Sequence, residues 1–508
     1  MRLLNAQIMD LSRHIQDLAD ELLSEILSFV LEPSSSTRNC HSFGNGHGQD
    51  SIDTYSHHRG EASDLDRWRL VCKRFMRIGT PRQFSRFVIR FSLDGFRRLE
   101  ELLKMQLACY VRTVTYLVRP FYTGSGWAHI LQTLHTYNTT LAEIHARRLH
   151  EQTNLIETDH DLIQLSRAIA AFPALQEIKL LRLQDSADEQ MIDFLHTSNT
   201  TTRAPYFNWE LACSRAVENL GIALLDSQCT AIRFIGPQIS PEATLKLLNA
   251  PSTTLAAMGS RLTSLDITFH SSKDISSTMA DLSDVFGRFF AEAKNLVSIH
   301  IGFPPKSPLD LDLEAIFHET RWKTLRTLSL QGWRLADHEI ISLARRHRRM
   351  LREIRLGAIY LRRGGRWRNV LAVLRGELER LERVELKEID YEENFDLLAS
   401  GSGVEVFDVP LDAQPDTLLS SSFSFAAGTP LPVVRNALGA EPAGVARGRL
   451  SAPWRSEDLE KLLTLTIHDM DDDGARVQRE QVGLWEAWVR SGLSRVSKGQ
   501  SHLHLREI

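Results

Sequence analysis

The sequence predicts a mixed α/β protein in which a short helical module precedes a solenoid of strand-and-helix repeats. Three observations support this prediction. Two amphipathic helical patterns lie within residues 15–80, a motif of three spaced apolar residues recurs between residues 175 and 386, and helical stretches separate its copies. The 508 residues, 43% of them hydrophobic, are enough for two or more domains and a large core.

The composition excludes several classes of protein. A net charge of −4 predicts no general attraction to nucleic acid or membrane. No run approaches the roughly 18 apolar residues of a membrane span, and the N-terminus lacks the apolar core of a signal peptide. The five scattered cysteines are expected to be reduced thiols: Cys40, Cys72, Cys109, Cys213 and Cys229. We therefore expect a soluble intracellular protein in the cytoplasm, the nucleus or both.

The first amphipathic pattern covers residues 18–30. Acidic Asp20 and Glu21 suit the positive dipole at the start of a helix. The apolar residues recur at steps of four and one, which places them in one stripe along a helix. The stripe consists of Leu18, Leu22, Leu23, Ile26, Leu27 and Val30.

The second pattern begins at Asp64, which can cap a helix, and ends near Gly79 and Pro81. Two short helices cannot bury two apolar stripes alone. They must pack on each other, on the following chain or on a partner. The apolar face of the second helix contains Leu65, Trp68, Val71, Cys72, Phe75 and Met76.

Together the two patterns resemble the F-box, the helical module that docks a substrate receptor onto the Skp adaptor of a cullin-RING ubiquitin ligase. The first half matches at Leu18, Glu21, Leu22, Leu23, Ile26 and Leu27, and the second at Leu70, Val71, Cys72 and Phe75. Ala19 replaces the usual proline, and residues 33–63 replace a short link. The alternative is two core helices of an α-rich domain. The resemblance implies that the adaptor contacts Leu18, Leu22, Leu23, Ile26, Leu27, Trp68, Leu70, Val71 and Phe75.

The insertion at 33–63 is rich in Ser, Gly, His and Asn. It has too few large apolar groups to offset the entropy of ordering, so we expect a disordered loop within the module of residues 15–80. Its glycines and histidines lack the strand, helix or ligand pattern of a phosphate loop or metal site.

After the module, residues 84–91 are expected to be extended, a helix should follow from Asp94, and the β-branched run at 111–118 predicts a strand. This order resembles the way that fungal F-box receptors lead into their repeat domain.

The repeated motif consists of leucine, two residues, an aliphatic residue, one residue and a second aliphatic residue. Its spacing of 26 to 34 residues from 229 onward matches leucine-rich repeats. Such units stack into a curved horseshoe, so residues 81–400 are predicted to form a leucine-rich-repeat-like α/β solenoid, including the lead-in. The alternative is an ordinary α/β domain with parallel strands. The units begin at Leu175, Leu262, Leu296, Leu325, Leu351 and Leu381, with a weaker one at Cys229.

An excess of arginine marks residues 344–383, which contain thirteen arginines and four glutamates. Arginine's planar fork suits phosphate and carboxylate, so the pattern predicts an acidic or phosphorylated target near Arg345, Arg349, Arg352 and Arg355. The alternative is a solvated helix face. Nucleic acid is disfavoured because no aromatic residues interleave with the arginines.

Residues 401–455 are rich in Ser, Pro, Ala and Gly and predict a linker or long loop, and residues 456–508 predict a strand and a helix. Here Asp469, Asp471, Asp473, Gly474 and Glu480 match the ligand spacing of an EF-hand calcium loop. The preceding residues 463–467 alternate like a strand rather than a helix. An acidic turn that caps the following helix is therefore favoured, and no metal site is assigned.

No catalytic motif is recognisable, and neither an enzyme nor a cofactor is expected. The first hypothesis is the substrate receptor of an SCF-type cullin-RING ligase, which binds a Skp-family adaptor, through it a cullin, and an unidentified target. The alternative is a repeat scaffold or binding protein without ligase function.

Overall fold

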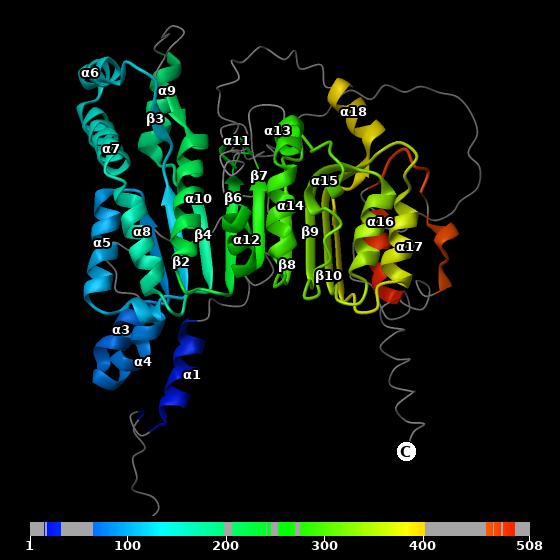
Figure 1. Ribbon diagram of the computed structural model, residues 1–508, viewed down its shortest axis with the longest axis horizontal. Coiled ribbons are helices and arrows are strands. Elements are labelled where there is room, and N and C mark those ends of the chain that lie inside the picture. The colour runs from blue at the N-terminus through cyan, green and yellow to red at the C-terminus, as the bar shows by residue number, and fades with distance from the viewer. Residues whose placement is uncertain are drawn as a thin grey trace, which may run out of the picture.

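The computed structural model describes residues 15, 18–31, 64–197, 206–239, 241–244, 252–269, 275–401, 464–470, 472–478 and 481–492. The insertion predicted at 33–63, and all but the first residue of the linker predicted at 401–455, lie outside the described residues. The protein is mixed α/β, with many helices around a large parallel sheet (Figure 1). Among the described helices, none combines the length and the apolar character that a membrane crossing requires.

The strands of the main sheet lie side by side in the order of the sequence, and every pair is parallel. Each predicted motif contributes one strand. The short strand β12 (Asp390–Tyr391) pairs with the far end of β10. The others are β1 (Arg86–Arg90), β2 (Thr113–Val118), β4 (Glu177–Arg182), β6 (Ile232–Ile239), β7 (Leu262–Phe269), β8 (Ser298–Gly302), β9 (Thr327–Leu335), β10 (Glu353–Leu361) and β11 (Arg383–Lys387).

One row of buried side chains crosses eight of these strands in register. In the weaker unit Phe234, not Ile232, occupies this row, since Phe234 pairs with Ile178 of β4 and with Leu265 of β7. The weaker motif was therefore aligned two residues too early. The row consists of Val114, Ile178, Phe234, Leu265, Ile299, Leu328, Ile354 and Val384, all at most 8% exposed.

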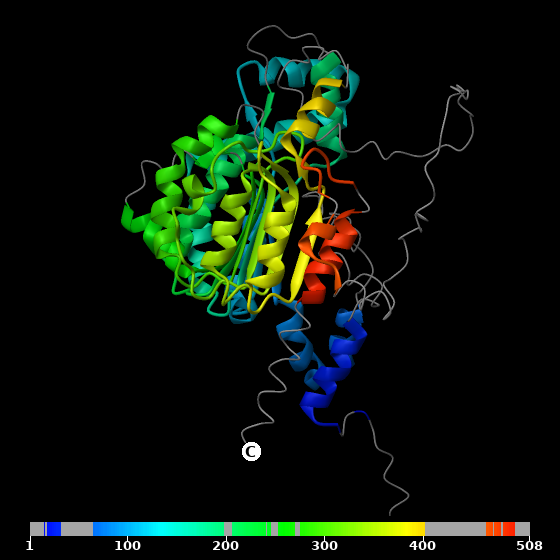
Figure 2. The same ribbon diagram turned by 90° about the vertical axis from the view of Figure 1, so that its right-hand side faces the viewer.

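A layer of helices covers the face of the sheet that carries this row (Figures 1 and 2). Burial of the aliphatic row against these helices supplies the main hydrophobic stabilisation of the fold. The layer contains α5 (Leu93–Lys104), α8 (His160–Ala171), α10 (Trp209–Leu225), α12 (Ser252–Arg261), α14 (Ser283–Glu292), α15 (Glu314–Phe317), α16 (Asp337–Arg346) and α17 (Trp367–Gly376).

The helical module consists of α1 (Asp20–Leu31), α3 (Asp64–Val71) and α4 (Lys73–Gln83). Because α4 leads directly into β1, the module lies beyond the amino ends of the strands (Figure 1). The second pattern had predicted one helix ending near Gly79 and Pro81, which is wrong. The backbone is extended at Cys72 (φ −163°, ψ 170°), so the chain forms two helices, and α4 continues through both residues.

A second, smaller core lies at the carboxyl ends of β2 and β4, and the sequence did not predict it. The strands β3 (Phe121–Thr123) and β5 (Tyr206–Asn208) are antiparallel. The helices α6 (Trp127–Tyr137), α7 (Thr139–Glu157) and α9 (Ser186–Thr197) pack around Tyr122, Trp127, Ile130, Leu134, Leu141, Ala142 and Met191.

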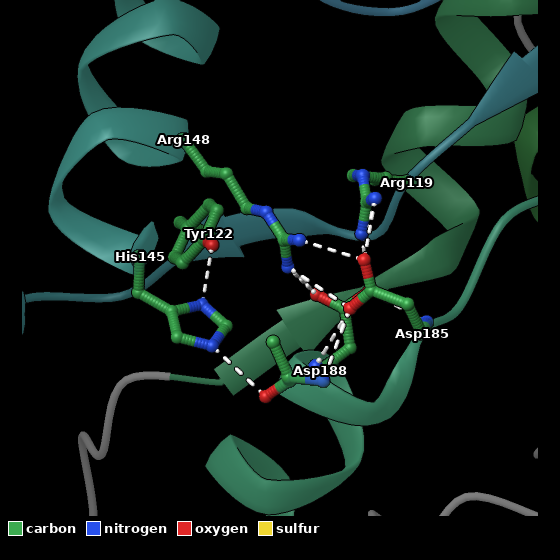
Figure 3. A network of polar contacts seen from close by, with 7 residues as sticks. Arg119, Tyr122, His145, Arg148, Asp185 and Asp188 are labelled. Atoms are coloured by element: carbon green, nitrogen blue, oxygen red, sulfur yellow. Dashed lines mark hydrogen bonds and ion pairs between the residues drawn. The ribbon is translucent and has the colours of Figure 1, made fainter. Parts of the chain in front are cut away.

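Two arginines and two aspartates hold this second core to the sheet (Figure 3). Arg119, just after β2, binds Asp185 and Asp188 at 2.7 and 2.5 Å, and Arg148 of α7 binds both at 2.7 Å. Although burial opposes ionisation, the two arginines lower the pKa of Asp185. The network therefore joins segments that follow two different strands.

The described part of the C-terminal segment includes a helix, residues 481–492, beside the last strand (Figure 2). Trp485, Trp488 and Val489 are at most 3% exposed and belong to the main core. The helix predicted within 456–508 is confirmed. The strand predicted there at 463–467 is wrong for its described residues, because Ile467–Asp469 form a 3-10 turn in which Asp469 caps Thr466.

Candidate functional site

The helical module has an interior of its own. Leu23, Leu27 and Phe75 are at most 2% exposed, and the rings of Trp68 and Phe75 lie 4.4 Å apart. Gly79 allows α3 and α4 to approach closely, since a Cβ atom there would lie 2.6 Å from Cγ of Arg69. The two helical patterns thus pack on each other across the 33–63 insertion.

Polar contacts hold α1 against α4. Arg82 donates to the carbonyl oxygen of Ser24 at 2.8 Å and to the hydroxyl of Ser28 at 2.7 Å. Arg74 and Arg77 bind Asp20 at 2.6 and 2.5 Å, and the hydrogen bond from Arg74 lowers the pKa of Asp20. These contacts fix the orientation of α1 relative to α4.

The module also exposes large apolar side chains to solvent on each of its three helices. Single exposed apolar residues are common in proteins, but a group of six on one small module is not. We call these residues the docking face: Leu22 at 48%, Phe29 at 68%, Val30 at 47%, Leu70 at 81%, Val71 at 57% and Met76 at 47% exposure.

The structure divides the nine residues predicted to bind the adaptor into three groups. Leu22, Leu70 and Val71 are in the docking face, whereas Leu23, Leu27 and Phe75 form the interior of the module. The remaining three, Leu18, Ile26 and Trp68, are half-buried. Phe29, Val30 and Met76 were not among the predicted site residues. Val30 and Met76 belong to the apolar stripes of the two amphipathic patterns, but such a pattern does not tell an inner face from a binding face, and Phe29 lies outside those stripes.

A cationic cleft lies between the loops that precede β9 and β10, at the same edge of the sheet as the module. Its volume is about 590 Å³. Parallel strands all start at one edge, so the loops before β9 and β10 and the helix before β1 share that edge. The cleft is lined by Arg321, Trp322, Lys323, Arg345, Arg346, His347, Arg348, Arg349 and Met350.

Three of the four arginines predicted to bind the target lie in or next to this cleft. Arg345 and Arg349 line it, and Arg352 follows in the same loop. Arg345 is bound to Glu377 at 2.6 Å and Arg352 to Glu382 at 3.1 Å. The charge count over residues 344–383 included both glutamates, but it could not show which arginines they pair with across about 30 residues.

Arg355 lies apart from the other three, in β10 on the face of the sheet opposite the helix layer. It binds Glu353 at 2.8 Å and faces Glu385 at 3.8 Å. In neighbouring strands of the same row, His300 Nδ1 lies 2.7 Å from the hydroxyl of Ser329, and its Nε2 lies 4.0 Å from Asp266. The contact between His300 and Ser329 thus joins two adjacent strands, β8 and β9.

A second cavity of about 470 Å³ lies at the opposite edge, between the ends of β1 and β2 and helix α7. Arg119 and Arg148 line it, but both are bound by Asp185 and Asp188 as described above. Its polar groups thus chiefly hold the second core to the sheet.

The acidic segment 469–480 is only partly described, since Asp471 and Glu480 lie outside the described residues. Asp469 accepts hydrogen bonds from Thr466, and Asp473 accepts from the backbone of Ala475 and Arg476. These contacts favour the acidic turn over a calcium loop. Asp472, outside the predicted ligand pattern, joins the segment to the sheet through the backbone N–H of Arg368 at 2.9 Å and the hydroxyl of Tyr391.

Comparison with known proteins does not assign the chain to a family. No model of a known protein family matches the chain, and no curated protein sequence matches it.

Proposed function

We propose that the protein is the substrate receptor of an SCF-type cullin-RING ubiquitin ligase. In this proposal α1, α3 and α4 are an F-box that binds a Skp-family adaptor, and through it a cullin. The repeats of residues 81–400 are a leucine-rich-repeat-like horseshoe that holds a target. The receptor breaks no bond itself. It raises the local concentration of the target near the ligase and fixes its orientation.

One observation carries this proposal: the docking face coexists with a fully formed interior in the same small module. Leu23, Leu27 and Phe75 already supply that interior, so the exposed Leu70 and Val71 are not needed to close it. Helix-in-groove binding uses such amphipathic faces, with aliphatic anchors at helical spacing. The order of the two halves along the chain, which resembles an F-box, favours the Skp adaptor as the partner.

The sheet supports the second half of the proposal. Its strands follow one another in sequence order, each joined to the next by helical segments on one face, which is the connectivity of a stacked repeat protein. In such proteins the uncovered face and the loops at the strand ends are available for binding. The alternative function, a repeat scaffold without ligase activity, uses the same sheet but leaves the docking face without an adaptor.

Reconstitution distinguishes the two functions. The purified full chain, a Skp-family adaptor and the N-terminal domain of a cullin are mixed and resolved by size-exclusion chromatography. A receptor co-elutes with both proteins in one complex. A chain that elutes alone, while adaptor and cullin still form their own complex, contradicts the proposal and favours the scaffold.

A further inference from the structure

The cationic cleft contains positive charge that its own carboxylates do not balance. Six cationic side chains line it, and within the described residues three carboxylates pair with them: Glu314, Glu377 and Glu379. His347 adds no charge near neutral pH, because burial lowers its pKa to about 4. An excess of about three positive charges therefore surrounds the cleft.

The arginines of the cleft differ in how their donors are used. Arg345 and Arg346 form short hydrogen bonds to Glu377 and Glu314, at 2.6 and 2.5 Å. Arg348 and Arg349 instead share the single carboxylate of Glu379. Their distances of 3.8 and 3.7 Å are too long for hydrogen bonds, so their N–H groups remain available.

Two further cations lie on the neighbouring loop, which precedes β9. Arg321 and Lys323 are exposed, and no carboxylate within the described residues forms an ion pair with either. The cleft thus contains four cations whose donors are available, from two consecutive repeats. Such an arrangement suits a compact anion with several acceptor oxygens.

The shape of the cleft favours a phosphorylated side chain over nucleic acid. A volume of about 590 Å³ accommodates a side chain and its immediate neighbours rather than a strand. Single-stranded nucleic acid needs exposed aromatic rings for stacking. Trp322 is the only tryptophan, tyrosine or phenylalanine among the residues that line the cleft. It is only 2% exposed, and its ring stacks on that of His347 with the centroids 5.3 Å apart.

We propose that this cleft binds a phosphoserine or phosphothreonine of the target protein, through Arg321, Lys323, Arg348 and Arg349. A phosphate monoester has a charge of roughly −1.5 to −2 and three acceptor oxygens, which match the excess charge and the available donors. As the site of target capture, the cleft rests on the proposed function. A target bound there would lie at the same edge of the sheet as the docking face.

The test uses the full chain and a peptide array with a central phosphoserine between degenerate positions, and matched arrays with serine or glutamate at the centre. We expect the phosphoserine array alone to retain the protein. The variant Arg348→Gln/Arg349→Gln should reduce that binding about tenfold or more, since it removes two charge-assisted donors. The control Arg98→Gln/Arg363→Gln removes the same charge from exposed positions outside the cleft and should bind like the wild type.

Several results would overturn the inference. Equal binding to the serine and phosphoserine arrays, or equal losses in both double variants, would show that the cleft does not recognise phosphate. Equal binding to glutamate would assign it to acidic segments, and displacement by oligouridine at lower concentration than by the free phosphopeptide would assign it to nucleic acid. Adaptor binding is titrated in parallel. Phosphoserine binding without adaptor binding supports the cleft and contradicts the ligase function, and the opposite result contradicts the cleft alone.

Discussion

The carboxylate of Glu486 accepts a hydrogen bond from the backbone N–H of Leu386 at 2.6 Å, at the outer edge of the last long strand. From the next turn of the same helix, Arg490 donates to the carbonyl oxygen of Val384 at 2.9 Å. Side chains thus satisfy backbone groups that an exposed edge strand would offer to another chain. The C-terminal helix therefore closes the end of the sheet and protects it from edge-to-edge association.

We predict that removal of this cap loosens β11 before it unfolds the rest of the sheet. Trp485 is fully buried, so Trp485→Ala should lower the local free energy of opening by about 3–5 kcal/mol. Hydrogen exchange measured by mass spectrometry should show faster exchange in residues 383–387, with β7 and β8 unchanged. Uniform acceleration across all strands would mean that the sheet unfolds as one unit.

The position of α1 should depend on Arg82. Arg82→Ala removes hydrogen bonds to two residues of α1, Ser24 and Ser28, and should lower the stability of the module by about 1–3 kcal/mol. Limited proteolysis and exchange within residues 20–31 report the loss. Arg77→Ala is the matched control: Arg77 is 71% exposed, so loss of its surface ion pair with Asp20 should change the stability by less than about 1 kcal/mol. Equal effects of the two variants would contradict the role assigned to Arg82.

Two buried histidines should make the fold less stable in mild acid. Burial lowers the pKa of His145 and of His347 to about 4, below the ordinary value near 6.5. Between these values the unfolded chain binds more protons than the folded one, so the free energy of unfolding falls as the pH drops from about 6.5 to about 4. The expected loss is roughly 1–3 kcal/mol for each histidine.

Denaturant titrations across this pH range measure the effect. His145→Gln should flatten the slope, because it removes a group that titrates only in the unfolded chain, whereas His150→Gln at an exposed position should leave the slope unchanged. If the slope were the same in both variants, the acid sensitivity would belong to other groups.

The sequence predicted the strands well because each motif consists of neighbouring residues whose apolar side chains are buried on one face of the sheet. The central residue of each of the six clear units lies in one buried row, whereas in the weaker unit Phe234 takes that place, two residues after Ile232. The second core was missed because it joins segments from after β2 and after β4. The contacts of Arg148 with Asp185 and Asp188 span 37 and 40 residues, and no local pattern reports them.

The candidate sites were predicted less completely for two physical reasons. The F-box resemblance matches residue types along the chain but does not tell an inner face from an outer one, so buried Phe75 and exposed Leu70 were placed in one predicted surface. Likewise, the charge count over residues 344–383 included Glu377 and Glu382 but did not show that they pair with Arg345 and Arg352. Only the folded repeats show which arginines retain available donors.

The most direct test of the proposed function is a calorimetric titration of a purified Skp-family adaptor into the full chain and two variants. Leu70→Asp/Val71→Asp places charges in the docking face, at positions 81% and 57% exposed, and Leu397→Asp places one at a position 70% exposed on α18 (Glu392–Gly401). All three proteins should unfold at similar temperatures, since none of these side chains is in a core. We predict that the wild type and Leu397→Asp bind equally and that Leu70→Asp/Val71→Asp binds at least about a hundredfold more weakly, because a charge in an apolar interface is left desolvated. Adaptor binding that is absent from the wild type, or unchanged in Leu70→Asp/Val71→Asp, would contradict the account.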